Sequence, residues 1–317
     1  MDQHAACLLY TSLKEMEERI LGAEEKLVQL EYEVFQVVKE KVAVASARIL
    51  TTASVLAGLD VLVSFAETAI KENYIRPKMN HSERIRIVEG RHPVVEKVLG
   101  PGNFVPNDID LHEERKLVLL TGPNMAGKST FMRQIALLVL MAQAGSFIPA
   151  LSAEIGIVDR IFTRIGAADD LAGGQSTFMV EMKECQVIVA NAQKNSLIIM
   201  DEVGRGTSTY DGISIARALV EYIIKHIGAK TVFSTHYHEL TDLGDMPGVH
   251  NFTMLVEEQK GKIYFMRKVV PGKADQSYGI HVAALAGLPE EIIAKAQKNL
   301  AELEQGETHQ IGISRCV

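Results

Sequence analysis

A glycine-rich loop between a short apolar strand and a helix constrains the fold of this chain more than any other feature. We predict a strand over residues 116–120 (KLVLL), the loop over residues 121–127 (TGPNMAG) and a helix over residues 128–144. The spacing Gly-x-x-x-x-Gly-Lys-Ser, which begins at Gly122, is that of a P-loop. Its glycines let backbone N–H groups wrap phosphate, so the chain is expected to bind a nucleotide.

The P-loop pattern also predicts roles for its residues. Lys128 is expected to reach the β- and γ-phosphates of the nucleotide and to act in catalysis, and the Ser129 hydroxyl is expected to take a place on Mg²⁺. The residues expected to bind the nucleotide are Gly122, Pro123, Asn124, Met125, Ala126, Gly127, Lys128, Ser129 and Thr130.

Further apolar runs indicate what surrounds the loop. Residues 196–200 (SLIIM) and 230–234 (KTVFS) are predicted to be buried strands, each followed by polar residues. Helices separate the apolar runs, and this order favours a mostly parallel sheet that helices cover on both faces. A strand at residues 84–88 and a strand pair at residues 251–256 and 262–268 are also predicted. The predicted fold class is therefore α/β.

Both ends of the chain are predicted to contain helices. Apolar residues recur every three or four positions over residues 13–44, so one face of a long helix forms an apolar seam. A second helix is predicted at about residues 47–71, and Arg76-Pro77 is expected to end it. The seam leaves two alternatives open: a helix packed on its own domain, or an extended coiled-coil arm. The last helix is predicted at about residues 289–304.

Composition limits the classes of function. The 317 residues suffice for one large domain and an accessory segment. Asp and Glu outnumber Lys and Arg by 40 to 33, and a formal charge of −7 does not favour binding to a polyanion. The three widely separated cysteines indicate a reducing compartment and argue against a disulfide or zinc framework. We find no continuous run of about 18 apolar residues and therefore expect no membrane partner.

Acidic residues follow the predicted strand at residues 196–200, where the carboxyl ends of parallel strands present their ligands. Asp201 is expected to hold Mg²⁺ through water, and Glu202 is expected to accept a proton from the attacking water. His236, just after the strand at residues 230–234, is expected to reach the γ-phosphate and to sense hydrolysis. A helix-capping role is the alternative for the two carboxylates.

A second glycine-rich segment, LAGGQS at residues 171–176, precedes a helix predicted to begin near Thr177. Such helix starts bind anions through their free N–H groups and the helix dipole. Because the segment is distant from the P-loop in sequence, it could face the γ-phosphate of a second subunit; a surface turn is the alternative. P-loop, LAGGQS, Asp-Glu and a following histidine occur in the order of ABC-type ATPases.

Several longer motifs narrow the family. GPNMAGKST, FTRIGAADDL, STFMVEM, DEVGRGTSTYDG, THYHEL and SYGIHVAALAGLP together resemble the ATPase domain of the MutS family of DNA mismatch repair proteins, with a match from about Leu13 to Leu303. The resemblance implies a Mg²⁺-dependent, ABC-type ATPase that acts as a homodimer with composite ATP sites. It also implies that Phe104 stacks on adenine and that Ser176 contacts the γ-phosphate bound by the partner subunit.

The resemblance further implies a division of the chain. Residues 13–76 are expected to be the end of the helical lever, 77–288 the ATPase domain and 289–305 a dimerisation helix. Residues 1–12 and 312–317 match nothing; we expect residues 1–12 to be non-native or disordered and residues 306–317 to be a disordered tail. Mismatched double-stranded DNA and a MutL-type repair protein are the partners implied for the full-length protein, whose mismatch-reading domain is absent here. The implied location is the cytoplasm, in association with the nucleoid.

Some features depart from the family pattern or leave alternatives. Ala126 stands where the family usually has glycine, and Arg267-Lys268 occupies a region where relatives can carry an adenine-facing histidine. Arg205 could act across a dimer or form an ordinary salt bridge. The alternative functions are the ATPase subunit of another ABC-type machine, or a dimerisation fragment that binds ATP without hydrolysing it.

Overall fold

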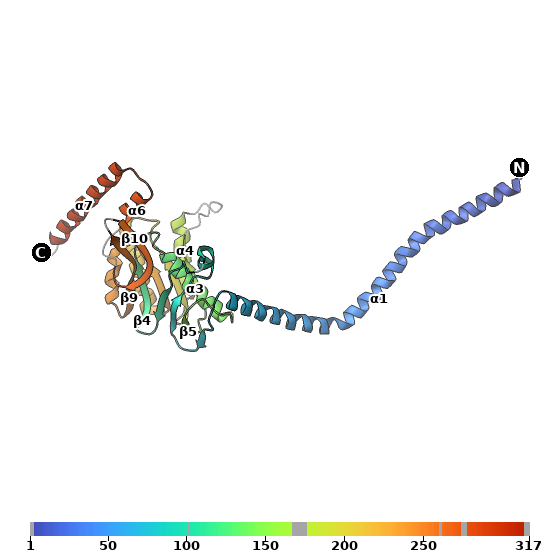
Figure 1. Cartoon of the computed structure of the whole chain (residues 1–317), viewed down its shortest axis with the longest axis horizontal. Coiled ribbons are helices and arrows are strands. Elements are labelled where there is room, and N and C mark those ends of the chain that lie inside the picture. Colours follow the sequence, from blue (N-terminus) through green and yellow to red (C-terminus); the bar gives the residue numbers. More distant parts are fainter. Residues whose placement is uncertain (1–2, 101, 167–175, 260–261, 274–277, 314–317) are drawn as a thin grey trace. The chain divides into compact units, whose positions relative to one another are not determined.

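The computed structural model describes residues 3–100, 102–166, 176–259, 262–273 and 278–313 of the chain (Figure 1). The chain divides into two units, Met1–Phe65 and Ala66–Val317. The first unit is helical throughout its described residues, and the second contains all the described strands.

Helix α1 (Gln3–Lys71) is one continuous helix of 69 residues. The structure thus differs from the expectation of two helices, because no proline interrupts the sequence between them and the glycines at 22 and 58 lie within regular helix. Residues 3–12, for which we expected disorder, are helical as well. The helix ends before Arg76-Pro77, because Asn73 adopts φ 53° and asparagine tolerates the left-handed conformation that closes helices.

Most large apolar side chains of α1 are exposed, from Leu13 at 59% to Ile70 at 80%, whereas Ala69 near the end of the helix is buried. An 18-residue window within Leu13–Lys71 has a mean hydropathy of 1.9, so α1 is long and apolar enough to cross a membrane by length and composition. We expected no such segment, because polar residues such as Thr51, Ser54 and Asp60 interrupt the apolar run while the mean hydropathy stays high. One helix of this kind is by itself weak evidence for a membrane span.

The larger sheet of the second unit has the strand order β10-β9-β4-β8-β7-β6. Strands β9, β4, β8, β7 and β6 are all parallel, and only the edge strand β10 pairs in the antiparallel sense. This confirms the predicted mostly parallel sheet. Its strands are β4 (Arg115–Thr121), β6 (Ile161–Arg164), β7 (Leu197–Asp201), β8 (Lys230–Ser234), β9 (Gly248–Gln259) and β10 (Lys262–Pro271).

Successive residues of β4 face opposite sides of this sheet. Val118 and Leu120 pack in one core with helix α3 (Lys128–Gln143), whereas Leu117 and Leu119 pack in a second core with α4 (Thr177–Asn191) and α5 (Thr209–Tyr222). All four β4 side chains are fully buried. Helices therefore cover both faces of the sheet, as predicted, and the apolar run KLVLL is explained by burial on both sides.

A smaller sheet with the order β1-β5-β2-β3 was not predicted as a unit. Its strands are β1 (Lys78–Asn80), β2 (Ile85–Gly90), β3 (Asn107–Leu111) and β5 (Ser152–Gly156). Isoleucines and a leucine of β2, β3 and β5 enter the same core as α3, and Met79 of β1 packs against that core. Only β2 was predicted, because the other strands are short and come together from distant parts of the sequence. Helix α3 is thus buried between two sheets.

The remaining elements connect or follow these layers. They are α2 (Pro93–Leu99), a π-helical turn (Ile223–Ile227), a 3₁₀ segment (His238–Asp245), α6 (Gly279–Leu285) and α7 (Glu290–Ile313). The predicted strand pair is present as the antiparallel strands β9 and β10. Helix α7 extends past residue 304 into the segment that we expected to be disordered.

Candidate functional site

The P-loop joins β4 to α3 through backbone conformations that side chains rarely allow. Gly122 has φ 128°, Met125 has φ 65° and Gly127, the N-cap of α3, has φ 105°. A Cβ on Gly122 would lie 3.2 Å from the Met254 backbone nitrogen, so glycine is required there for space as well as for conformation. No side chain caps the first turn of α3, which leaves its N–H groups available to an anion.

Lys128 lies inside this loop. Its Nζ donates to the carbonyl oxygens of Gly122 at 2.6 Å and of Pro123 at 3.1 Å, and it lies 3.8 Å from Glu202 Oε1. The side chain is buried, and this burial lowers the pKa of Lys128, although nearby carboxylates oppose the effect. An ammonium group is therefore held by the loop carbonyl oxygens at the start of α3. The substitution to Ala126 causes no conflict, because its methyl group is fully buried in the core beside α3.

Asp201 and Glu202 stand at the carboxyl end of β7, as predicted. Ser234 at the end of β8 lies opposite Asp201 in the sheet and donates a hydrogen bond to its carboxylate. The Glu202 N–H donates to the carbonyl and hydroxyl oxygens of Ser234, both at 3.1 Å, and Glu202 adopts φ 55°. The neighbouring strand thus fixes the carboxylate of Asp201 and the backbone of Glu202, and neither carboxylate acts as a helix cap.

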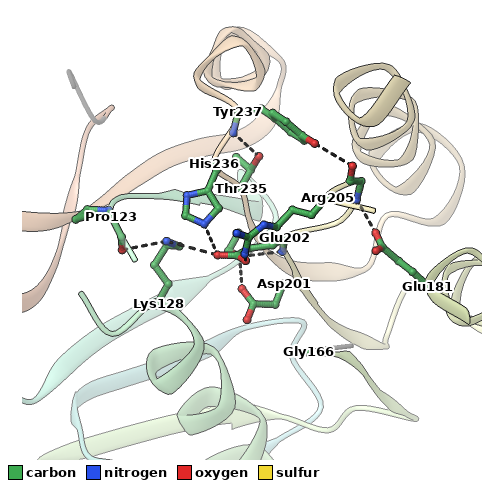
Figure 2. A network of polar contacts seen from close by, with 12 residues as sticks. Pro123, Lys128, Gly166, Glu181, Asp201, Glu202, Arg205, Thr235, His236 and Tyr237 are labelled. Carbon is green, nitrogen blue, oxygen red and sulfur yellow. Dashed lines mark hydrogen bonds and ion pairs between the residues drawn. The ribbon is translucent and has the colours of Figure 1, made fainter. Parts of the chain in front are cut away.

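Three cationic or imidazole side chains converge on the Glu202 carboxylate: Lys128, Arg205 and His236 (Figure 2). Burial raises the pKa of this carboxyl, but the hydrogen bond to His236 and the surrounding positive charges outweigh burial and lower its pKa to about 2. Arg205 therefore forms an ion pair within its own chain, which is one of the two alternatives left open by the sequence.

The expected Mg²⁺ ligands lie on one cavity. Ser129 and Asp201 both line it, together with Glu202 and Thr177. Over the residues that the structure describes, no group of three or more His, Cys, Asp or Glu side chains could hold a metal ion by itself. A hydroxyl and one carboxylate nevertheless fit Mg²⁺, because this ion keeps several waters and takes further ligands from nucleotide phosphates.

A second cavity, of about 300 Å³, lies beside the P-loop. Phe104 lines it together with Val95, Leu99 and Thr130, so an aromatic ring and aliphatic groups are available to a flat base. Arg267 lines the same cavity, at a β-bulge where its φ is 54°. The Phe104 hypothesis thus fits the geometry, and a guanidinium lines the same cavity, in the region where relatives can carry an adenine-facing histidine.

Ser176 begins α4, as predicted from the LAGGQS segment. Its hydroxyl accepts a hydrogen bond from the Met179 N–H at 3.2 Å and caps the helix. Residues 171–175 of that segment lie outside the described residues, as do Asp169 and Asp170, the two aspartates of the motif FTRIGAADDL.

The sequence analysis did not predict that several other residues lie around Asp201 and Glu202. Glu181 and Tyr237 hold the backbone of Gly204, and Arg164 pairs with Glu181. The serine at the end of β8 could have been found from strand register, since it follows the apolar run directly. Glu181 gave no such signal, because one glutamate in an amphipathic helix is usually exposed.

Comparison with known proteins gives one consistent result. Residues 118–304 match the family MutS domain V. The chain is 61% identical over 293 residues to the DNA mismatch repair protein MutS of Pelotomaculum thermopropionicum, covering 92% of this chain and 34% of that protein. The corresponding protein of Halothermothrix orenii is 59% identical over 297 residues, covering 92% of this chain and 33% of that protein.

The chain thus spans about a third of the length of the curated relatives that it matches. The family match covers more than half of the chain and includes the P-loop helix, both acidic residues at the end of β7 and the strands between which they lie. On this evidence the chain belongs to the MutS family.

Proposed function

We propose that this chain is the ATP-binding and ATP-hydrolysing domain of a MutS-type DNA mismatch repair protein, with an ABC-type P-loop fold. The observation that carries the proposal is the convergence at one sheet edge of Lys128, Ser129, Asp201, Glu202 and His236, which come from the ends of β7 and β8 and from the start of α3. Each side chain has the chemistry that ATP hydrolysis requires there.

In this proposal the first turn of α3 and Lys128 bind the phosphates, and Phe104 stacks on the base. Ser129 and Asp201 hold Mg²⁺, which supplies charge neutralisation on the phosphate oxygens when bound. Glu202 orients the attacking water and accepts its proton, and His236 senses the γ-phosphate. Lys128 would leave the carbonyl oxygens of Gly122 and Pro123, to which it donates in this structure, and move to the phosphate when the nucleotide binds.

The pKa of Glu202 must rise if this carboxylate is to act as a general base. A general base works best when its pKa is near the working pH, and a pKa of about 2 is far below it. Phosphate charge beside Lys128 would offset the cation that now stabilises the carboxylate. We therefore expect nucleotide binding to raise the pKa of Glu202.

Membership of the MutS family supports a wider role for the chain. Two subunits would form composite ATP sites, in which Ser176 reaches the nucleotide of the partner subunit, and α7 would contribute to the dimer. Mismatched double-stranded DNA and a MutL-type protein would be the partners of the full-length protein, in the cytoplasm and at the nucleoid. Helix α1 would be part of the lever that links DNA to the ATPase domain.

The first experiment replaces Glu202→Gln in the 317-residue chain. The amide keeps the size of the side chain but cannot accept the proton, so we expect phosphate release to fall by at least about 100-fold while binding of a fluorescent ATP analogue stays within about twofold. Glu221→Gln on α5 is the control, because its ion pairs with Arg217 and Lys225 are exposed. Turnover at the unaltered rate would exclude Glu202 as the base.

A non-catalytic ATP-binding module remains the second candidate, and the low pKa of Glu202 is the observation that favours it. Tight binding of Mg-ATP by the unaltered chain without phosphate release would support this second candidate over the first.

A further inference from the structure

A buried ion pair lies beside the acidic pair and has no part in the mechanism above. Arg164, the last residue of β6, and Glu181 on α4 are joined at 2.9 Å between Nη2 and Oε2, and their side chains are 5% and 4% exposed. Arg164 also donates to the carbonyl oxygens of Gly166 at 3.1 Å and Asp201 at 3.4 Å. Because a buried ion pair is often no more stabilising than apolar residues of the same volume, stability alone does not explain its presence.

The second carboxylate oxygen of Glu181 has a different partner. It accepts a hydrogen bond from the Gly204 N–H at 2.5 Å, while the Gly204 carbonyl accepts one from the Tyr237 hydroxyl at 2.9 Å. Figure 2 shows these two side chains reaching the same short backbone segment from opposite sides. Gly204 itself has φ 95°, and a Cβ there would lie 2.7 Å from the Gly212 carbonyl oxygen. The backbone two residues after Glu202 is therefore held on three sides.

The restraint on Gly204 lies next to Glu202, whose backbone conformation is itself unfavourable. Glu202 has φ 55°, a conformation that costs free energy in a residue other than glycine and persists where the surroundings determine it. Ser234 fixes the N–H of Glu202 on one side, and Glu181 and Tyr237 fix Gly204 on the other. These backbone contacts from β8, α4 and the segment after β8 contribute to the direction of the Glu202 carboxylate, which also contacts Lys128, Arg205 and His236.

We infer that Glu181 is a positioning residue that sets the rate of ATP hydrolysis by aiming Glu202 through the Gly204 N–H, without contacting the nucleotide. The inference rests on the proposed function, because it assigns Glu202 as the base. It also has a consequence for α4: Ser176 at its start and Glu181 further along belong to one helix, so a displacement of α4 is transmitted to the carboxylate of the same chain.

Two matched double variants separate positioning from folding. The first variant combines Arg164→Met with Glu181→Gln, and the second combines Arg164→Met with Glu181→Leu. Both variants remove the two buried charges together, so neither leaves an unpaired buried charge. Only the glutamine keeps an oxygen that can accept from the Gly204 N–H. Glu184→Gln is the single-site control, since Glu184 lies on the same helix, is 48% exposed and is 3.6 Å from Arg164.

The readouts are kcat and KM for Mg-ATP, the thermal unfolding midpoint, and hydrogen exchange of the backbone amides at residues 203–206. We expect kcat of the leucine variant to be at least about tenfold below that of the glutamine variant, with KM within about twofold. We also expect faster exchange of the Gly204 amide in the leucine variant alone. Similar unfolding midpoints of the two variants would show that folding does not cause the difference.

Equal kcat values in the two double variants, with an active unaltered chain, would overturn this inference and leave the proposed function intact. Equal exchange at the Gly204 amide would likewise overturn it, because the hydrogen bond would then not restrain the loop. If the unaltered chain released no more phosphate than Glu202→Gln, both the proposed function and the role of Glu181 would be excluded.

Discussion

The state of Glu202 depends on charges contributed by distant parts of the chain. Lys128 comes from α3, and His236 follows β8, while Arg205 lies in the loop that Glu202 begins. Together they hold the pKa of Glu202 at about 2 although the carboxyl is partly buried. The Glu202 carboxylate is therefore ionised and paired with these cations, and under the proposed function phosphate would compete for them.

The substitution Arg205→Ala should change the free energy of unfolding by an amount that depends on pH, because Arg205 is paired with Glu202. The folded pKa of Glu202 lies below its unfolded value, so its contribution to the free energy of unfolding is present above the unfolded value and is lost as the pH falls towards 2. Removing Arg205 raises the folded pKa. Because Arg205 is 56% exposed, we expect the variant to be less stable at pH 7 by under about 1 kcal/mol, with a difference that shrinks on acidification.

Urea denaturation of the two proteins between pH 7 and pH 3 measures this difference. Arg86→Ala is the control, because Arg86 is exposed on β2 and the described residues give it no ion pair. A stability difference for Arg205→Ala that stays constant over the whole pH range would contradict the assigned electrostatic origin.

At the scale of elements, close backbone contact connects α5 to the loop after β7. Gly212 in the first turns of α5 has no room for a side chain, since a Cβ would lie 2.4 Å from both the Gly204 carbonyl oxygen and the Tyr237 hydroxyl. The helix thus packs directly on the backbone that orients Glu202. Gly204 and Gly212 of the segment DEVGRGTSTYDG are required by this packing, whereas a Cβ on Gly206 would meet Phe178 of α4.

Gly212→Ala is therefore expected to destabilise the protein by about 1–3 kcal/mol, because the methyl group must displace the loop or the tyrosine. Gly58→Ala is the matched helical control: nothing lies within 4 Å of the added Cβ, and the substitution should be neutral or stabilise the helix by up to about 1 kcal/mol. Chemical denaturation measures both values. A Gly212 variant as stable as the unaltered chain would show that the contact relaxes at no cost.

At the scale of the whole molecule, the proposed ATP sites need two chains. The P-loop, Mg²⁺ ligands and base belong to one chain, whereas Ser176 is assigned to the site of the other. The formal charge of −7 gives the chain no overall attraction for DNA. Association of two chains is therefore better explained by the proposed nucleotide site that they share than by a common contact with DNA.

Phosphate release per chain should consequently rise with protein concentration and then saturate, as monomers associate into dimers. The measurement uses saturating Mg-ATP across a wide range of concentration, with light scattering on the same samples to report association. A rate per chain that stays constant while the light scattering shows only monomer would indicate a self-sufficient site and exclude Ser176 in trans.

The sequence by itself determined the glycine-rich loop, the buried strands β4, β7 and β8 beside it, and the acidic pair at the end of β7. These features depend on local chemistry: a P-loop needs glycines at fixed spacing, and strands buried on both faces need uninterrupted apolar runs. Residues 116–120, 196–200 and 230–234 were predicted for this reason, and the structure has strands at these positions.

Only the tertiary structure decided which distant groups meet. The smaller sheet, the Arg164–Glu181 pair and the contacts of Glu202 join residues far apart in sequence, and periodicity carries no information about such pairings. The seam of α1 shows the same division. Its spacing determined a helix with one apolar face, but a helix buries that face only against a second surface, and spacing does not specify which surface that is.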